Sequence, residues 1–113
     1  MIIEKAIREY LLAEIPQASV YAEVPPSPDA TRIEIERTGG GEEEHIRSAM
    51  VAIKSIAPTL YGAAVLHEAV LATMPLMAAS DDISSVKLNS EYNFTDTTTK
   101  EYRYQAVFDI IYY

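Results

Sequence analysis

The last third of the chain alternates apolar and polar residues in two runs, which predicts two β-strands. In the first run, apolar side chains fall on one side and polar side chains on the other, the apolar set being Val86, Leu88, Tyr92 and Phe94. The second run, residues 102–113, begins with the same alternation and ends with four apolar or aromatic positions in a row. A period of two is typical of a half-buried strand. The polar residues 95–100 between the runs favour a turn, so a hairpin is expected.

Earlier apolar patterns predict two helices and three more strands. Helical spacing over residues 2–15 ends at Pro16, and a second helix begins at Pro58 or Thr59 and ends or kinks near Thr73, before Pro75. Strands are expected over residues 19–24, 31–38 and 45–57, and the last of these is apolar at both parities, as a central strand would be.

The order α-β-β-β-α-β-β predicts an α+β fold in one domain, residues 1–113. We expect a two-layer sandwich with a mixed, mostly antiparallel sheet of about five strands and two helices on one face. Connectors are short, which favours antiparallel neighbours. A crossover through the second helix leaves room for one parallel contact.

Two loops are candidates for contact with a partner. Residues 25–29 begin with Pro25 and Pro26 and lack three amide donors, so they are expected at the surface, as a rigid connector or a partner-facing loop. The second is a run of flexible glycines followed by like charges, which predicts a mobile loop: Gly39, Gly40, Gly41, Glu42, Glu43 and Glu44.

Composition narrows the classes of function. The chain has 113 residues, no cysteine and a net charge of −8, which argues against disulfides, thiolate chemistry and a phosphate-binding surface. Charged residues interrupt the N-terminal apolar run, so no signal peptide is expected and the interpretation is cytoplasmic. Residues 56–79 include His67, Glu68 and Pro75, so a membrane span is not expected.

No constellation of reactive residues is visible. His45 and His67 have no partner at ligand spacing, and the acidic residues lie in solvated runs, so no metal, cofactor or catalytic residue is predicted. His67 is interpreted as a packing or interface residue. A small-ligand-binding or enzymatic α+β domain and a DNA-binding module remain the alternatives from other classes.

Eight tyrosines stand out, because tyrosine is enriched at interfaces. Tyr112 and Tyr113 are the interface candidates, since a terminal residue rarely enters a core. Removing both is expected to weaken assembly more than folding. The apolar end of that strand also predicts a central place in the sheet or burial against a neighbouring subunit.

Three stretches carry a resemblance to a known family: Tyr21-Ala22-Glu23-Val24-Pro25, the segment around Glu36-Arg37-Thr38-Gly39-Gly40, and the hairpin segments 85–96 and 103–109. They resemble the tail-terminator, or tail-completion, family of long-tailed phages and of prophages in Gram-positive bacteria. The resemblance implies a non-enzymatic virion protein of α+β fold. A head-tail connector adaptor, or another minor tail or capsid component, is the alternative within this class.

In that family the protein forms a ring, typically a hexamer, assembled in the host cytoplasm at the head-proximal end of the tail. The implied partners are other copies of the chain, the tail tube protein and the head connector proteins. DNA would pass through the ring without specific binding, and no membrane partner is implied. Net negative charge favours passage of DNA over adhesion.

Overall fold

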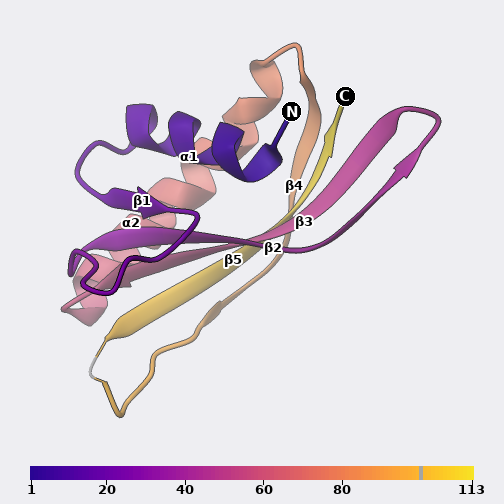
Figure 1. The fold of residues 1–113 in the computed structure, drawn as a ribbon. Coiled ribbons are helices and arrows are strands. Elements are labelled where there is room, and N and C mark those ends of the chain that lie inside the picture. The colour runs from indigo at the N-terminus through magenta and orange to yellow at the C-terminus, as the bar shows by residue number, and fades with distance from the viewer. Residues whose placement is uncertain (100) are drawn as a thin grey trace.

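The computed structural model describes residues 1–99 and 101–113 and has two layers (Figure 1). A five-stranded sheet of order β1-β2-β3-β5-β4 forms one layer, and α1 and α2 pack on one of its faces. The elements follow the predicted order, and the α+β class is confirmed: α1 Ile3–Glu14, β1 Ser19–Tyr21, β2 Arg32–Glu43, β3 Ile46–Ala57, α2 Leu60–Thr73, the 3₁₀ helix η1 Met74–Ala79, β4 Ile83–Asn93 and β5 Tyr102–Tyr112.

Both helices begin and end where local chemistry requires. Helix α1 buries Ile3, Ile7 and Leu11 on one side and ends just before Pro16. In α2, the Thr59 hydroxyl accepts a hydrogen bond from the Gly62 amide at 3.0 Å, which caps the first turn. The α-helical part of this segment ends at Thr73, and Pro75 lies in the first turn of η1, as the sequence predicts.

Strand β3 lies at the centre of the sheet, between β2 and β5. Its pairing with β2 is antiparallel and runs from Arg32 opposite Ile56 to Glu43 opposite Ile46. The only parallel pair among the described strands is β1 with β2, which are joined through residues 25–29, the proline-rich loop. The predicted parallel contact through the second helix does not form among these strands. Strand β1 is also shorter than expected, since it ends at Tyr21.

The prediction of a mobile loop at residues 39–44 is wrong. The glycines belong to β2, and the chain turns only at Glu44 and His45, whose φ angles are +50° and +70°. Two positive φ angles in a two-residue connection are typical of a type I′ turn, which matches the twist of the paired strands. The three glycines therefore lie in a ladder, where partners on β3 hold them in place.

The β4–β5 hairpin is confirmed, but its sides differ from the predicted ones. Ser84 and Asn89 are bulged out of the pairing with β5. A bulge adds one residue and so reverses the parity of everything after it. Val86 pairs with Ile110 toward the helices, whereas Tyr92 pairs with Gln105 on the opposite face. The prediction that Val86 and Tyr92 share a side is therefore wrong.

The end of β5 lies between β3 and β4, which confirms its central place in the sheet. Tyr112 is completely buried and is among the largest side chains of the core, whereas 60% of the Tyr113 surface is exposed. The Tyr112 ring lies 5.2 Å from the Arg47 guanidinium carbon. The argument that a terminal residue stays out of the core fails for Tyr112, because neighbours on both sides fix the strand up to this position. Contact with a partner remains a prediction for Tyr113.

We predict that Tyr112→Ala lowers the free energy of unfolding by about 3–5 kcal/mol, because it leaves a large cavity in the core. Tyr113→Ala, one residue further along the chain, is the matched control and should change the free energy of unfolding by less than about 0.5 kcal/mol. Urea denaturation followed by circular dichroism measures both. Equal losses in the two variants would contradict the burial difference.

Candidate interaction surfaces

Few polar side chains of the described residues lie in the core. No three His, Asp or Glu side chains among residues 1–99 and 101–113 converge as metal ligands. Ser55 and His67 are buried polar side chains, and the Ser55 hydroxyl and His67 Nδ1 have no hydrogen-bond partner. Because both lie inside the core, an external substrate does not reach them.

His67 has the packing role expected for it. Its ring stacks on Tyr104 with centroids 5.0 Å apart, and Nε2 lies 3.1 Å from Glu91 Oε1. Glu91 reaches this position because the bulge at Asn89 turns it toward the helices. These contacts join α2 to the β4–β5 hairpin.

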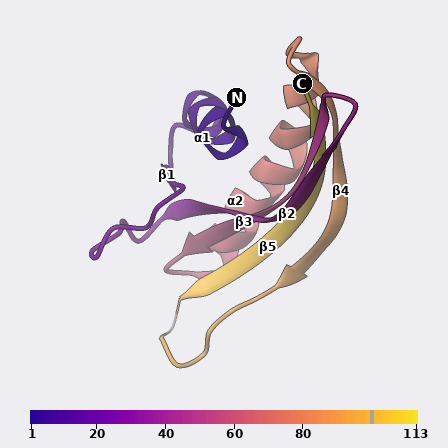
Figure 2. The same cartoon turned by 45° about the vertical axis from the view of Figure 1, so that its right-hand side comes forward.

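The β2–β3 hairpin ends in an exposed acidic tip, residues 42–46. The tip extends past the last pair between β3 and β5, Arg47 with Tyr112, and lies at the opposite end of the molecule from the β4–β5 connector (Figures 1 and 2). Glu43 and Glu44 form no ion pair with any residue described, and the side chain of Ile46 is 47% exposed. This tip combines charge with an apolar side chain.

We call the sheet face opposite the helices the open face. Next to the tip, glycines leave this face concave, because they have no side chains. Gly39 and Gly41 point to this side, and two adjoining depressions of about 430 and 370 Å³ are lined in part by Ser48, Met50 and Ile111. The depression nearer the tip is also lined by glutamates, whereas the one beside Met50 is mainly apolar, and both contain predicted glycine candidates.

Gly40 faces the other way and accommodates Arg37. A Cβ atom at Gly40 would lie 2.4 Å from Arg37 Nη2 and 2.6 Å from the Ser48 carbonyl oxygen. Arg37 Nε donates to the Gly39 carbonyl at 3.3 Å, so its guanidinium lies flat along the strand. Only glycine leaves this space free.

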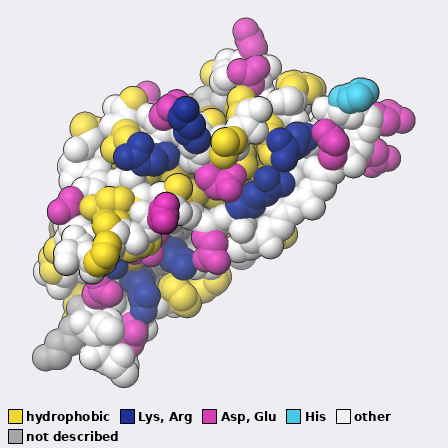
Figure 3. All heavy atoms as spheres, in the orientation of Figure 1, with side chains coloured by type: hydrophobic (Ala, Val, Ile, Leu, Met, Phe, Trp, Pro, Cys, Tyr) yellow, Lys and Arg dark blue, Asp and Glu magenta, His cyan; other side chains and the backbone are white. Residues whose placement is uncertain are grey.

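Three arginines with no carboxylate partner lie on α1, β2 and β3. We call Arg8, Arg37 and Arg47 the basic patch. Each donates a hydrogen bond to a backbone carbonyl, of Val20, Gly39 and Met1 respectively, at 3.0–3.3 Å. None of the three is within ion-pair distance of a described carboxylate. In Figure 3, basic side chains gather over α1 and beside the root of the β2–β3 hairpin, and acidic side chains gather at its tip.

The other end of the sheet shows the opposite arrangement, because its cations are paired. Arg32 is buried and contacts Glu34 at 2.7 Å and Glu101 at 2.9 Å. Although burial lowers the pKa of Arg32, its hydrogen bonds with both carboxylates outweigh burial and raise that pKa. Arg103 pairs with Asp96 at 3.3 Å, and hydrogen bonds from Thr98, helped by Arg103, hold the pKa of Asp96 below its usual value.

This network covers apolar residues of the open face. Phe94 lies beneath Lys54 and Arg103, at 5.9 and 5.1 Å from its ring centre. Ile56 and Ala52, which point to the same side of β3, are buried. The stems of long charged side chains can cover apolar surface in this way. The open face is therefore closed at this end and uncovered near the tip.

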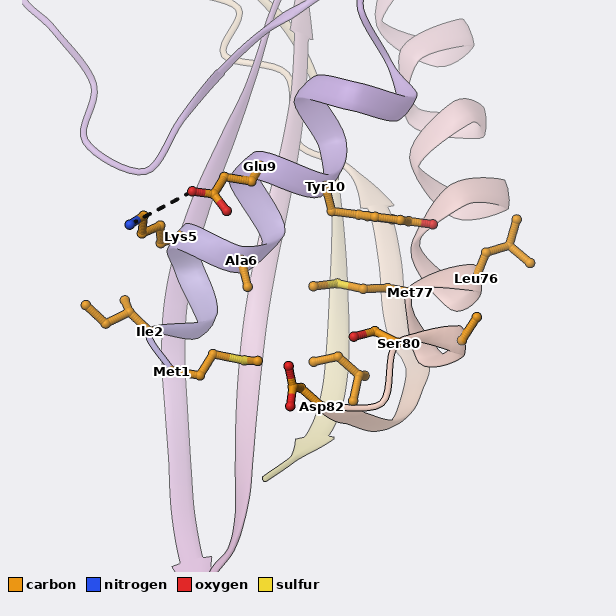
Figure 4. A pocket seen from close by; sticks show the side chains of 12 residues that line it. Met1, Ile2, Lys5, Ala6, Glu9, Tyr10, Leu76, Met77, Ser80 and Asp82 are labelled. Carbon is orange, nitrogen blue, oxygen red and sulfur yellow. Dashed lines mark ion pairs between the residues drawn. The ribbon is translucent and has the colours of Figure 1, made fainter.

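A groove of about 850 Å³ separates α1 from η1 (Figure 4). Tyr10 and Met77 reach into it from the two sides, and Lys5 and Glu9 flank it with their ends 3.9 Å apart. The Tyr10 hydroxyl donates to the Thr73 carbonyl at 2.8 Å, and burial, with a smaller contribution from Glu14, raises the pKa of Tyr10. Most of the lining is apolar.

The outer side of α2 is an apolar surface that the sequence interpretation missed. Tyr61 is 81% exposed, and Leu60 and Val65 lie exposed nearby. A signal was present, since α2 is apolar around almost its whole circumference, and such a helix needs cover on both sides. By length and composition alone, Leu60–Ala79 is apolar enough to cross a membrane. Here its inner side packs on the sheet through Ala63, Leu66 and Val70.

The proline-rich loop lies far from the acidic tip. Pro25 and Pro26 are exposed, and the loop is held at its base by Asp29, whose side chain bonds the hydroxyls of Ser19 and Tyr21. Figures 1 and 2 place this loop and the hairpin tip at opposite ends of the sheet. The structure thus brings Gly39, Gly40, Gly41, Glu42, Glu43 and Glu44 together with the end of β5, but not with Pro25 and Pro26.

Comparison with solved structures shows a likeness in fold, whereas the two sequence comparisons found no match. No protein-family model matches the chain, and no curated protein matches it. A chain in the virion of the native gene transfer agent (GTA) particle has a similar structure, with a TM-score of 0.63 and 17% sequence identity. The match covers 97% of this chain and 89% of that chain. At this identity the likeness establishes the fold, and it does so over nearly the full length of both chains.

We predict that Gly40→Ala destabilises the hairpin by about 1–3 kcal/mol, because the added methyl group collides with the Ser48 carbonyl and displaces Arg37. Gly41→Ala is the control, since its Cβ would meet Ser48 Oγ at 3.7 Å, an ordinary contact. Amide hydrogen exchange of residues 37–50 measures the local effect. Equal exchange rates in the two variants would show that Gly40 makes no special room.

We also predict that Glu44→Asn combined with His45→Gly stabilises the hairpin tip by about 1 kcal/mol, because Asn-Gly suits the positive φ angles of a type I′ turn. The measurement is the exchange protection of the Ile46 amide and of its neighbours on β2. Loss of protection in the double variant would contradict the turn geometry.

Proposed function

We propose that this protein is a structural component of a phage-like virion, and specifically a tail terminator that caps the tail tube as a homo-oligomeric ring and joins it to the head connector. The observation that carries the proposal is the fold likeness to a chain of the GTA virion over 97% of this chain and 89% of that one. The resemblance of residues 21–25, 33–40, 85–96 and 103–109 to tail-terminator proteins supports the specific role.

The arrangement of exposed apolar residues supports an assembly of several copies. One apolar surface lies on the outer side of α2, around Tyr61 and Val65, and another lies on the open face of the sheet, around Met50 and Ile111. Different surfaces on opposite sides of a protomer suit head-to-tail contacts, and such contacts close into a ring when the rotation permits.

The buried Ser55 and His67 serve packing, and the ion pairs of Arg32 and Arg103 join strands to loops. The net charge of −8 suits a ring through which DNA passes, because it disfavours adhesion to phosphates.

A small-ligand-binding domain is the second candidate, and the groove between α1 and η1 is the observation that favours it. Its volume of about 850 Å³ and its apolar lining are in the range of small-molecule sites. A tail role does not require this groove, so the two candidates make different predictions for a variant that fills it.

We expect the purified protein to form rings, or ring-forming smaller oligomers, and to bind the ends of purified tail tubes. Native mass spectrometry gives the copy number, and electron microscopy of the mixture shows whether the protein lies at tube ends. Ala6→Trp, which fills the groove, should leave both results unchanged.

A protein that stays monomeric at high concentration and with tail tubes would contradict the ring. Binding to head connectors but not to tubes would assign the adaptor role instead. Binding of a small molecule that Ala6→Trp abolishes would favour the second candidate.

A further inference from the structure

We propose that the acidic hairpin tip of one copy docks on the basic patch of the next copy, and that this contact holds the oligomer together. The inference rests on the proposed function, because it assigns a charged contact between copies of the ring, in addition to the apolar surfaces on α2 and on the open face. Its two halves are Glu43 and Glu44 at the tip and Arg8, Arg37 and Arg47 of the basic patch.

The basic patch is unusual in a chain with 17 acidic and 9 basic residues. Arg32, Arg103 and Lys54 each pair with a carboxylate of the same chain, as an excess of acids would lead one to expect. The three arginines of the patch instead bond to carbonyl oxygens. A carbonyl bond holds each guanidinium in place and leaves its remaining N–H donors free for a carboxylate from outside.

The tip has the complementary charge and a fixed shape. Glu43 pairs with Ile46 in the ladder, so the two-residue turn presents Glu44 at the extreme end of the hairpin. The exposed Ile46 adds apolar area beside the acids. A short, rigid acidic projection can approach several guanidinium groups with little loss of conformational freedom.

The tip does not satisfy the patch of its own chain. Strand β3 is paired with β2 on one side and with β5 on the other up to Arg47, so the tip is held in line with the strands and does not fold back. Glu42 lies opposite Arg47 in the ladder, yet Arg47 bonds to the Met1 carbonyl and forms no ion pair with it. The neighbouring copy is therefore the occupant that brings matching charge.

The two surfaces differ, so the contact is head-to-tail. Each copy would offer its tip to one neighbour and its patch to another, which is the arrangement that a closed ring requires. Because the charges are at the surface, the contact should weaken as ionic strength rises.

The decisive experiment reverses the charge of each surface separately. Glu43→Arg with Glu44→Arg reverses the tip, and Arg8→Glu with Arg47→Glu reverses the patch, while Arg37 is kept because it packs over Gly40. We expect each double variant to weaken association at least about tenfold, because like charges then face each other. Glu14→Arg with Asp81→Arg is the control, since both acids are exposed and unpaired among the described residues and belong neither to the tip nor to the apolar surfaces on α2 and the open face.

Mixing the two reversed variants then restores both contacts. The basic tip of one variant meets the acidic patch of the other, and the acidic tip of the second meets the basic patch of the first, so mixed oligomers should form at close to wild-type affinity. Sedimentation velocity measures association, and the thermal midpoint of each variant shows whether it folds. Restored assembly also requires that both variants are folded.

The possible results separate this contact from the ring itself. If the wild type assembles but both reversed variants assemble like the control, the contact is wrong and the ring stands. If mixing folded variants fails to restore assembly, the pairing of tip with patch is wrong. If the wild type never assembles, the ring and the contact both fail. If reversing the patch abolishes binding of duplex DNA at low salt while assembly persists, the patch binds nucleic acid instead.

Discussion

The antiparallel ladder between β2 and β3 is the constraint on which the other features depend. In its first half, Ile33 and Ile35 face the helices and form part of the core, while Arg32 points to the open face and is tied down by two carboxylates. In its second half the same ladder continues past the core through the glycines and ends in a strained turn. Because β5 pairs with β3 almost to that turn, the tip inherits the rigidity of the sheet. Because the tip continues two core strands, its direction is fixed. A flexible loop would have no fixed direction.

The sequence predicted the structure correctly where a residue's neighbours along the chain determine its conformation. Alternation, helical spacing and the positions of Pro16 and Pro75 predicted the element order and most boundaries. The predictions were wrong where pairing with another strand determines a residue's conformation or burial. Glycines at positions 39–41 favour flexibility in isolation, and only pairing with β3 makes them a strand. The bulge at Asn89 depends on the register against β5, so alternation alone assigned Tyr92 to the wrong face. Tyr112 is buried because two strands flank it, although it is the penultimate residue.

The candidate surfaces were predictable to a smaller degree. Pro25 and Pro26 are exposed as expected, and the acidic residues 42–44 lie at the surface, although in a hairpin end and not in a mobile loop. The basic patch gathers Arg8 from α1 with Arg37 and Arg47 from two strands, and nothing in the linear sequence relates them. The groove between α1 and η1 likewise depends on tertiary packing. The outer side of α2 differs, because the scarcity of polar residues in this helix was visible in the sequence, although the sequence interpretation did not use it.

The two bulges of β4 protect the edge of the sheet from pairing with a strand of another chain. The strand forms the outer edge of the sheet, and an unpaired edge is a template on which another chain can add a strand. Ser84 and Asn89 break the regular spacing of amide and carbonyl groups along that edge, and Lys87 adds a charge between them. A second sheet therefore finds no continuous register to extend. Unlimited growth into fibres is disfavoured at this edge, so the proposed ring would form through contacts between side chains, whose geometry limits the number of copies.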